Sequence, residues 1–286
     1  MDPRNAALRA NRHTYDAMAA KKDPLCRPAS DAELADPLST VDPIGWLGGS
    51  INGWRVLCLA AGGGRHSSLY SAAGAQVTVV DYSPAMLELD RQMAARHGHR
   101  VRIIETSMDN LAGLGDESFD LVVHPVSTCY LPDVSGVFRE VARVTKPGGL
   151  YISQHKTPVS LQTSLRRGGG GSYEILHSYY RREPVPAPEH WSAAARRLRE
   201  HGATEYLHRW EELIGGICRS GFVVEDLTEP MHADSTSAAD SFADRCRFAA
   251  PYVRIKARRR TTTTGPNHRA ADAASSPSTA PKIWTP

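Results

Sequence analysis

The sequence of 286 residues lacks any apolar run of the roughly 18 residues that would cross a bilayer. Its polar beginning, 1–24, has no continuous apolar segment of the kind that marks a secretory signal peptide. The five cysteines are odd in number and widely spaced, without a Cys-x-x-Cys pair or a Cys/His cluster at zinc-ligand spacing. These absences predict a cytoplasmic protein with reduced thiols, no membrane association and no bound metal.

The sequence also lacks a strong charge of either sign. Its 34 Lys and Arg nearly balance 31 Asp and Glu, which leaves a formal net charge of +3 that neither predicts nor excludes a nucleic-acid partner. The basic run 254–260 could bind RNA, but its alternation with apolar residues is also typical of a half-exposed edge strand. No NPPY-type tetrapeptide or appended RNA-binding module is present, so we expect no nucleic-acid partner. We also expect the protein to be a monomer or a homodimer.

From 54 onward, short apolar runs alternate with helical patterns. This rhythm predicts an α/β protein with a Rossmann-like, doubly wound, mostly parallel sheet of seven strands and an antiparallel last strand. A helix is expected to begin at Ser83-Pro84 and to stop at Gly98. The other expected strands and helices lie at 54–60, 65–74, 75–81, 100–106, 119–127, 133–145, 150–156, 206–210, 211–221, 223–230 and 251–259.

Three segments depart from this rhythm. Residues 1–43 are expected to form a helical arm and a connector in which prolines interrupt regular structure. Residues 156–206 contain four consecutive glycines, an aromatic patch and a Pro-rich stretch, and we interpret them as a cap or lid inserted into a catalytic domain of 44–260. The tail 261–286 is rich in Thr, Ser, Ala and Pro and is expected to be disordered.

A glycine loop follows the first strand, and an acid ends the second. Gly62, Gly63 and Gly64 allow close approach of a ligand, and the helix beyond them begins with free N–H groups. Asp81 stands where a carboxylate can accept hydrogen bonds from both hydroxyls of a ribose. The loop does not complete the dinucleotide pattern G-x-G-x-x-G, because Ser67 takes the third position. The combination predicts a nucleoside site, and a tight turn without a ligand is the alternative.

Two further loops are expected at the same edge of the sheet. Ser107 or Asp109 could hydrogen-bond an adenine amine, and Met108 could lie against the ring, although a polar surface turn fits equally well. His124 follows the fourth strand, where it could act as a base or could simply cap backbone groups. Aromatic and histidine side chains of the insertion could line an acceptor pocket or form the core of a small cap.

Taken together, the segments VLCLAAGGG, VTVVDYSPAML, DESFDLVVHPVS, EVARVTKPGG and EELIGGICRSGFVVEDLTEP resemble class I S-adenosylmethionine-dependent methyltransferases that act on small molecules. The resemblance implies S-adenosylmethionine as cofactor and S-adenosylhomocysteine as product. It implies a cofactor site made of Tyr15, Ala60, Gly62, Gly64, Asp81, Tyr82, Met86, Ser107, Met108, Asp109 and His124.

In this resemblance, Ala60, Gly62 and Gly64 hold the amino-acid part of the cofactor, and Asp81 binds its ribose. Tyr82, Met108 and Asp109 surround the adenine, His124 lies beside the methionine end, and Tyr15 of the arm closes over the site. For the small-molecule acceptor, the expected contacts are Tyr130, His155, Tyr173, Tyr179 and His208. His124 and His177 are the candidate catalytic bases, with His155 and His208 as further candidates.

The first motif departs from the usual pattern of these enzymes at two positions. Cys58 stands in place of an acid, and Ala60 in place of the first glycine. These departures motivate a second hypothesis, a protein that binds the cofactor without turnover. RNA methylation and a nicotinamide-dependent oxidoreductase remain as further alternatives, although Ser67 disfavours the latter.

Overall fold

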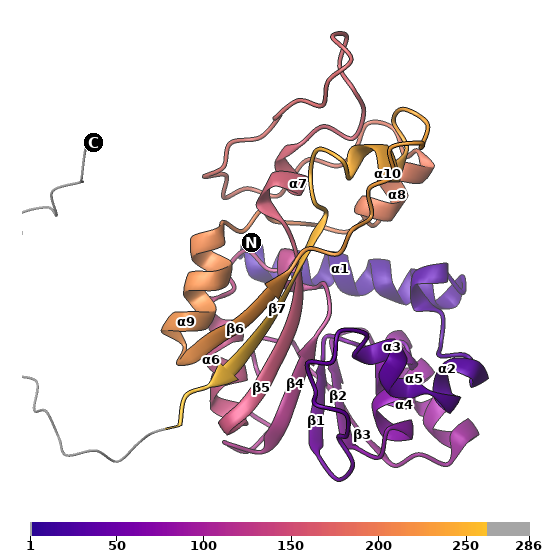
Figure 1. Ribbon diagram of the computed structural model, residues 1–286, viewed down its shortest axis with the longest axis vertical. Helices are drawn as coiled ribbons and strands as arrows, with labels where there is room; N and C mark the ends of the chain where they lie inside the picture. The colour runs from indigo at the N-terminus through magenta and orange to yellow at the C-terminus, as the bar shows by residue number, and fades with distance from the viewer. Residues whose placement is uncertain (1, 262–286) are drawn as a thin grey trace, which may run out of the picture.

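The computed structural model describes residues 2–261. Its strands are β1 (Arg55–Leu59), β2 (Gln76–Asp81), β3 (Val101–Glu105), β4 (Phe119–His124), β5 (Thr145–Lys156), β6 (Phe222–Thr228) and β7 (Tyr252–Arg259). They form one sheet in the order β3-β2-β1-β4-β5-β7-β6 (Figure 1). Strands β1 to β5 pair in parallel, and β7 runs antiparallel to both neighbours. The predicted mostly parallel sheet with an antiparallel last strand is confirmed.

Strand β7 lies inside the sheet, between β5 and β6, so the expectation that it forms an edge is wrong. Its basic side chains face polar partners on the neighbouring strands. Arg254 donates to the Gln154 side chain at 3.1 Å, and Arg258 and Lys256 both pair with Glu225. Cross-strand pairing, rather than protection of an open edge, accounts for the alternation of these cations.

Helices cover both faces of the sheet, as the alternation along β1 requires. Val56 and Cys58 pack in the core beneath α4 (Arg65–Ala72) and α5 (Pro84–His97). Leu57 and Leu59 point to the opposite core, which is covered by α6 (Ser135–Val144) and α9 (Gly216–Arg219). A π-helical turn, Glu211–Gly215, leads into α9. Buried on both faces, the central strands read as nearly continuous apolar runs in the sequence.

Helix α5 begins and ends at the residues expected from its sequence. The Ser83 side chain accepts a hydrogen bond from the Met86 amide, Pro84 occupies the first helical position, and Gly98 closes the helix at φ +68°. The fifth strand starts earlier than expected, because 145–149 continue directly from α6 into β5. The stretch 206–210, expected as a strand, forms an irregular buried entry to the π-helical turn.

The N-terminal segment contains more helix than expected. Helix α1 (Pro3–Ala20) runs across the carboxyl ends of the parallel strands (Figure 1). The 3-10 turn η1 (Pro24–Cys26) and two short helices, α2 (Asp31–Ala35) and α3 (Pro37–Val41), follow. Prolines were expected to interrupt this connector, but Pro37 occupies the first turn of α3, where a missing N–H is tolerated.

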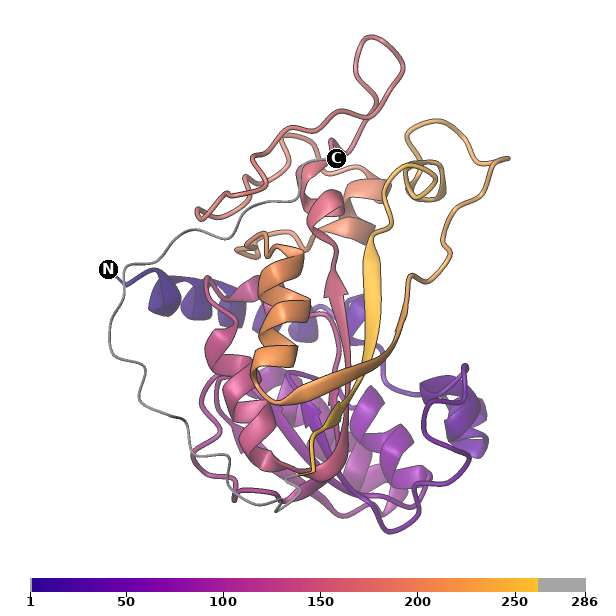
Figure 2. The same cartoon turned by 60° about the vertical axis from the view of Figure 1, so that its left-hand side comes forward.

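A cap lies above α1, on the side away from the sheet (Figures 1 and 2). The insertion after β5 contributes α7 (Pro158–Gln162) and α8 (Ala193–Leu198), and the β6–β7 connection contributes α10 (Phe242–Arg245). Leu198 and Phe242 share one small core. The fully buried Arg245 guanidinium donates to the carbonyl oxygens at the end of α7. The cap is therefore built from two chain segments, and the sequence indicated only the first.

Among residues 2–261, no helix is both long and apolar enough to cross a membrane. All five cysteines are free thiols. Of the tail 261–286 that was expected to be disordered, every residue after Thr261 lies outside the described residues.

Candidate cofactor and acceptor site

A cavity of about 450 Å³ opens at the carboxyl ends of β1, β2 and β4, beneath α1. Nine of the predicted site residues line it: Tyr15, Ala60, Gly62, Asp81, Tyr82, Met86, Ser107, Met108 and Tyr130. Because these residues come from five separate segments of the chain, the cavity is a product of the fold and not of one motif. Gly64, Asp109, His124 and the remaining candidates lie outside its lining.

The glycine loop is packed tightly against α5. A Cβ on Gly62 would lie 2.8 Å from the Met86 Cβ and 3.0 Å from the Asp81 carboxylate carbon. Gly64 adopts φ +79°, and a Cβ there would lie 2.9 Å from the Leu89 carbonyl oxygen. Ala60 takes φ +47°, a conformation that glycine adopts at lower cost. The backbone at 60 thus keeps the shape that such a loop requires, although the residue is alanine.

Asp81 holds the loop and still faces the cavity. Its Oδ2 accepts the Gly62 amide at 2.9 Å, and its Oδ1 accepts the Ser83 amide at 2.9 Å. Burial raises the pKa of Asp81, and these backbone hydrogen bonds oppose that rise. A carboxylate can accept about four hydrogen bonds, so Asp81 keeps acceptor capacity beyond its backbone partners. The arrangement fits two adjacent hydroxyls of a ribose.

The adenine side of the cavity differs from expectation at Asp109. Tyr82, Ser107 and Met108 line the cavity, but the Asp109 carboxylate points to α1. There, Arg4 donates to both of its oxygens, at 2.5 and 2.7 Å, and Ser107 donates to one of them. Asp109 therefore anchors the N-terminal helix, and its expected contact with adenine is not supported.

The opposite end of the cavity is lined by Tyr15, Tyr130, Gln154, Glu200 and Tyr252. The Tyr15 hydroxyl donates to the Tyr130 hydroxyl at 2.7 Å, and Tyr130 in turn hydrogen-bonds Glu200. Burial raises the pKa of both tyrosines, so both hydroxyls stay protonated. This end therefore presents polar groups on largely aromatic walls.

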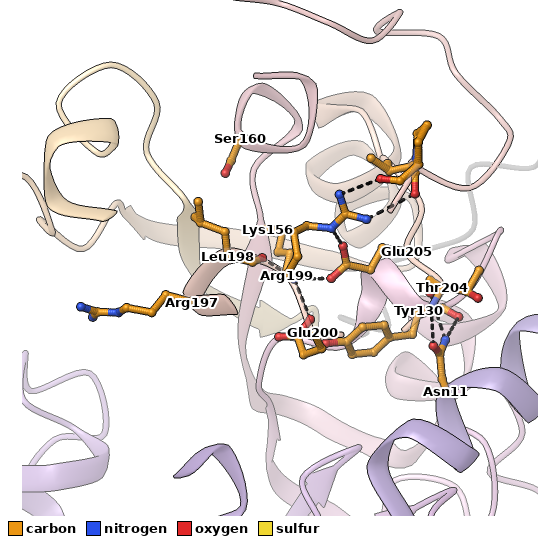
Figure 3. A network of polar contacts seen from close by, with 12 residues as sticks. Asn11, Tyr130, Lys156, Ser160, Arg197, Leu198, Arg199, Glu200, Thr204 and Glu205 are labelled. Atoms are coloured by element: carbon orange, nitrogen blue, oxygen red, sulfur yellow. Dashed lines mark hydrogen bonds and ion pairs between the residues drawn. The ribbon is translucent and has the colours of Figure 1, made fainter. Parts of the chain in front are cut away.

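Glu200 belongs to a buried network of alternating charges (Figure 3). The Lys156 ammonium contacts Glu200 at 2.9 Å and also pairs with Glu205, which in turn pairs with Arg199. Glu205 is completely buried, and the side chains of Lys156 and Arg199 are 3% and 9% exposed. Burial raises the pKa of Glu200, but Lys156 and Tyr130 outweigh this, and the pKa lies below its usual value. Glu200 is thus ionised at neutral pH.

The network joins three parts of the chain. Lys156 ends β5, whereas Arg199, Glu200 and Glu205 belong to the cap segment. Asn11 of α1 donates to the Thr204 carbonyl oxygen and accepts from its amide, which ties the N-terminal helix to the same segment (Figure 3). The cap is therefore fixed over the cavity by buried polar contacts.

His124 stands behind the cavity wall. Its Nδ1 hydrogen-bonds the Tyr151 hydroxyl at 2.8 Å, and its Nε2 hydrogen-bonds the Ser127 hydroxyl at 2.6 Å. Burial lowers the pKa of His124 to about 3, so the ring is neutral and both nitrogens are occupied. The role of catalytic base is not supported, and His124 instead orients Ser127, which does line the cavity.

His155 and His208 are also buried away from the cavity. His155 is hydrogen-bonded to Thr128 and Ser153, and burial lowers its pKa well below the usual value. The His208 Nε2 lies 3.1 and 3.0 Å from the carbonyl oxygens of Thr128 and Leu131. Both rings fasten the loop after β4, and their expected contact with an acceptor is not supported.

The insertion's other candidates make structural contacts. Tyr173 donates to Asp244 at 3.0 Å, and the Tyr179 hydroxyl accepts the Trp210 amide. His177 is half-buried and lies outside the cavity lining, as do both tyrosines. The expected roles of His177 in catalysis and of Tyr173 and Tyr179 in acceptor binding are not supported, because all three lie outside the cavity lining.

The chain matches the family model described as "Methyltransferase domain" over residues 57–153. It is 36% identical over 179 residues to the uncharacterized methyltransferase YbaJ of Bacillus subtilis (strain 168), covering 63% of this chain and 69% of that protein. It is 33% identical over 131 residues to a ubiquinone biosynthesis O-methyltransferase of Bordetella pertussis, covering 43% of this chain and about half, 54%, of that protein.

Among solved structures, an S-adenosylmethionine-dependent methyltransferase from Mesorhizobium loti has the same fold. Its TM-score is 0.61 at 23% identity, covering 79% of this chain and all of that chain. The fit of the glycine loop and Asp81 to a nucleoside agrees with these relationships. The chain belongs to the S-adenosylmethionine-dependent methyltransferase family.

Proposed function

We propose that this methyltransferase transfers the methyl group to a hydroxyl or amine of a small molecule bound between Tyr130, Gln154, Glu200 and Tyr252. The observation that carries the proposal is the continuity of one cavity from Asp81 to Glu200. A nucleoside held at Asp81 and an acceptor held at Glu200 would share this space. The name of the Bordetella relative, an O-methyltransferase, supports a hydroxyl as the first choice.

Bound S-adenosylmethionine supplies an activated methyl carbon with a good leaving group, so the protein's contribution is mainly positioning. The ionised Glu200 would accept a hydrogen bond from the acceptor's O–H or N–H, direct its lone pair toward the methyl group, and take the proton that the oxygen or nitrogen loses as its new bond to carbon forms. Because Lys156 holds Glu200 in place, the carboxylate requires little reorganisation. Tyr15 and Tyr130 remain protonated donors. Tyr15 donates to Tyr130, and Tyr130 hydrogen-bonds Glu200, so both tyrosines help to orient this carboxylate.

Helix α1 and the cap would exclude water from this end of the cavity. Their anchors are polar: Arg4 binds Asp109 and Asn11 binds Thr204 in partly buried contacts, and Lys156 binds Glu205 in a fully buried one. Release of the product would require part of this cover to move, and we infer that the 156–206 insertion serves as the lid. A cytoplasmic location and the absence of a nucleic-acid partner belong to the same proposal.

Replacement of Glu200 by Gln tests the acceptor site. We expect Glu200→Gln to lower kcat/KM about 10-fold or more, since one charge-assisted hydrogen bond contributes about 1.5–3 kcal/mol. The affinity for S-adenosylhomocysteine should stay within about twofold. Turnover is measured as formation of S-adenosylhomocysteine with a panel of phenols, catechols and amines.

The control is Glu189→Gln, an exposed glutamate of the same insertion, which should match the wild type. If the wild type binds S-adenosylhomocysteine but turns over no acceptor in the panel, the binding-only hypothesis is favoured instead. Equal turnover in Glu200→Gln and the wild type would remove Glu200 from the acceptor site.

A further inference from the structure

Asp90 of α5 is a buried carboxylate that no established feature of the site explains. It is 0% exposed, and within residues 2–261 no cationic side chain pairs with it. Its partners belong to the glycine loop and to the first turn of α4. The Gly63 amide donates to Oδ2 at 3.0 Å, and the Ser67 hydroxyl donates to Oδ1.

Two carboxylates therefore hold two successive amides of the loop. Asp81, at the end of β2, accepts the Gly62 amide, and Asp90 accepts the Gly63 amide from the other side. Ser67, the residue that breaks the dinucleotide pattern, is the hydroxyl that fixes the orientation of Asp90. The direction of each of these two amides is thus set by a carboxyl group from a different element.

Keeping this carboxylate buried is costly. Burial and the nearby charge of Asp81 raise the pKa of Asp90, while the hydrogen bonds from Ser67 and Gly63 lower it, and the net pKa is about 7. A leucine or alanine at this position of α5 would avoid the cost. Within residues 2–261, the hydrogen-bond donors to this carboxylate belong to the glycine loop and to α4.

Cys58 lies on the same side of the sheet as Asp90. It packs in the core with Leu87, one helical turn before Asp90 on α5, and it is completely buried. Burial raises the pKa of the Cys58 thiol, and the charge of Asp90 adds to this rise. Position 58 is the one at which similar enzymes carry an acid within the first motif.

We propose that Asp90 is a positioning residue that holds the glycine loop in its cofactor-binding shape, and that it supplies from α5 the carboxylate that position 58 lacks. Two departures then belong to one arrangement. Cys58 departs from the first motif of similar enzymes, and Ser67 departs from the dinucleotide pattern. A neutral Cys58 avoids a second buried negative charge beside Asp90, and Ser67 provides the hydroxyl that Asp90 accepts.

Calorimetric titration with S-adenosylhomocysteine tests this proposal. We expect Asp90→Ala to lose affinity roughly 10-fold or more, the equivalent of one charge-assisted hydrogen bond. Glu88→Ala, an exposed acid of the same helix, should bind like the wild type. The double variant Cys58→Asp/Asp90→Ala should recover most of the lost affinity, a rescue that a purely structural role of Asp90 would not give.

Thermal melting establishes that each variant is folded. If Asp90→Ala does not fold, Asp90→Asn replaces it and should still weaken binding severalfold. Affinity within twofold of the wild type in whichever of these variants is folded would overturn the positioning role. If the double variant is folded yet binds no better than Asp90→Ala, Asp90 does not supply the carboxylate that position 58 lacks, and that part of the proposal is wrong.

Discussion

Replacement of Asp81 by Ala should reduce the affinity for S-adenosylhomocysteine at least about 100-fold. Two hydrogen bonds from ribose hydroxyls to a carboxylate contribute about 1.5–3 kcal/mol each, and about 1.4 kcal/mol corresponds to a factor of ten. The change also removes the acceptor of the Gly62 amide, which leaves the loop without one of its two carboxylate supports. Calorimetric titration of the folded variant measures the loss.

Asp116→Ala is the matched control, because Asp116 is an aspartate with a 73% exposed side chain that pairs with Arg143 far from the cavity. Its affinity should equal that of the wild type. An unchanged affinity in folded Asp81→Ala would mean that the nucleoside does not bind at the end of β2, and the proposed cofactor site would then be wrong.

Replacement of Glu205 by Gln should lower the free energy of unfolding by about 3–5 kcal/mol. Removing one partner of a buried ion pair leaves the other charge uncompensated, and this is the usual cost. Here the substitution leaves Arg199 without its carboxylate and weakens the hold on Lys156. Denaturant unfolding followed by circular dichroism gives the difference.

Glu225→Gln provides the comparison on the sheet surface. Glu225 also accepts from two cations, Lys256 and Arg258, but its side chain is 30% exposed. Exposed pairs contribute about 0–1 kcal/mol, so this variant should differ little from the wild type. If both variants lost the same small amount, the buried network would not be what fixes the cap.

The contact between the glycine loop and Asp81 was predictable because it is local in sequence. A strand, a glycine loop and a helix place Gly62 beside the carboxyl end of the next strand, and Asp81 ends that strand. Any parallel sheet of this connectivity brings the two together. The helix caps Ser83 and Gly98 are local signals of the same kind.

The proposed acceptor half was not predictable, because its residues meet only through the tertiary fold. Glu200 lies 44 residues beyond Lys156 in an insertion without a recognisable motif. At one position, the alternation of side chains along a strand could have indicated which residue faces the cavity. Gln154 and His155 are neighbours on β5, so only one can face the cavity, and it is Gln154.

Two histidines that were expected as catalytic candidates are buried crosslinks, for a physical reason. A histidine at a strand end is compatible with a base, yet a buried imidazole can also serve as a neutral crosslink with two hydrogen-bonding nitrogens. His124 and His155 both take the second role. Sequence spacing does not distinguish the two roles, because the distinction depends on whether water and substrate reach the ring.

A crystal structure of the complex with S-adenosylhomocysteine tests the central claim most directly. The account predicts that both ribose hydroxyls contact Asp81, that the base lies near Tyr82 and Met108, and that the sulfur points toward Tyr130 and Glu200. A ligand bound outside this cavity, or one whose sulfur points away from Glu200, would contradict the claim that a single cavity brings the methyl donor and its acceptor together.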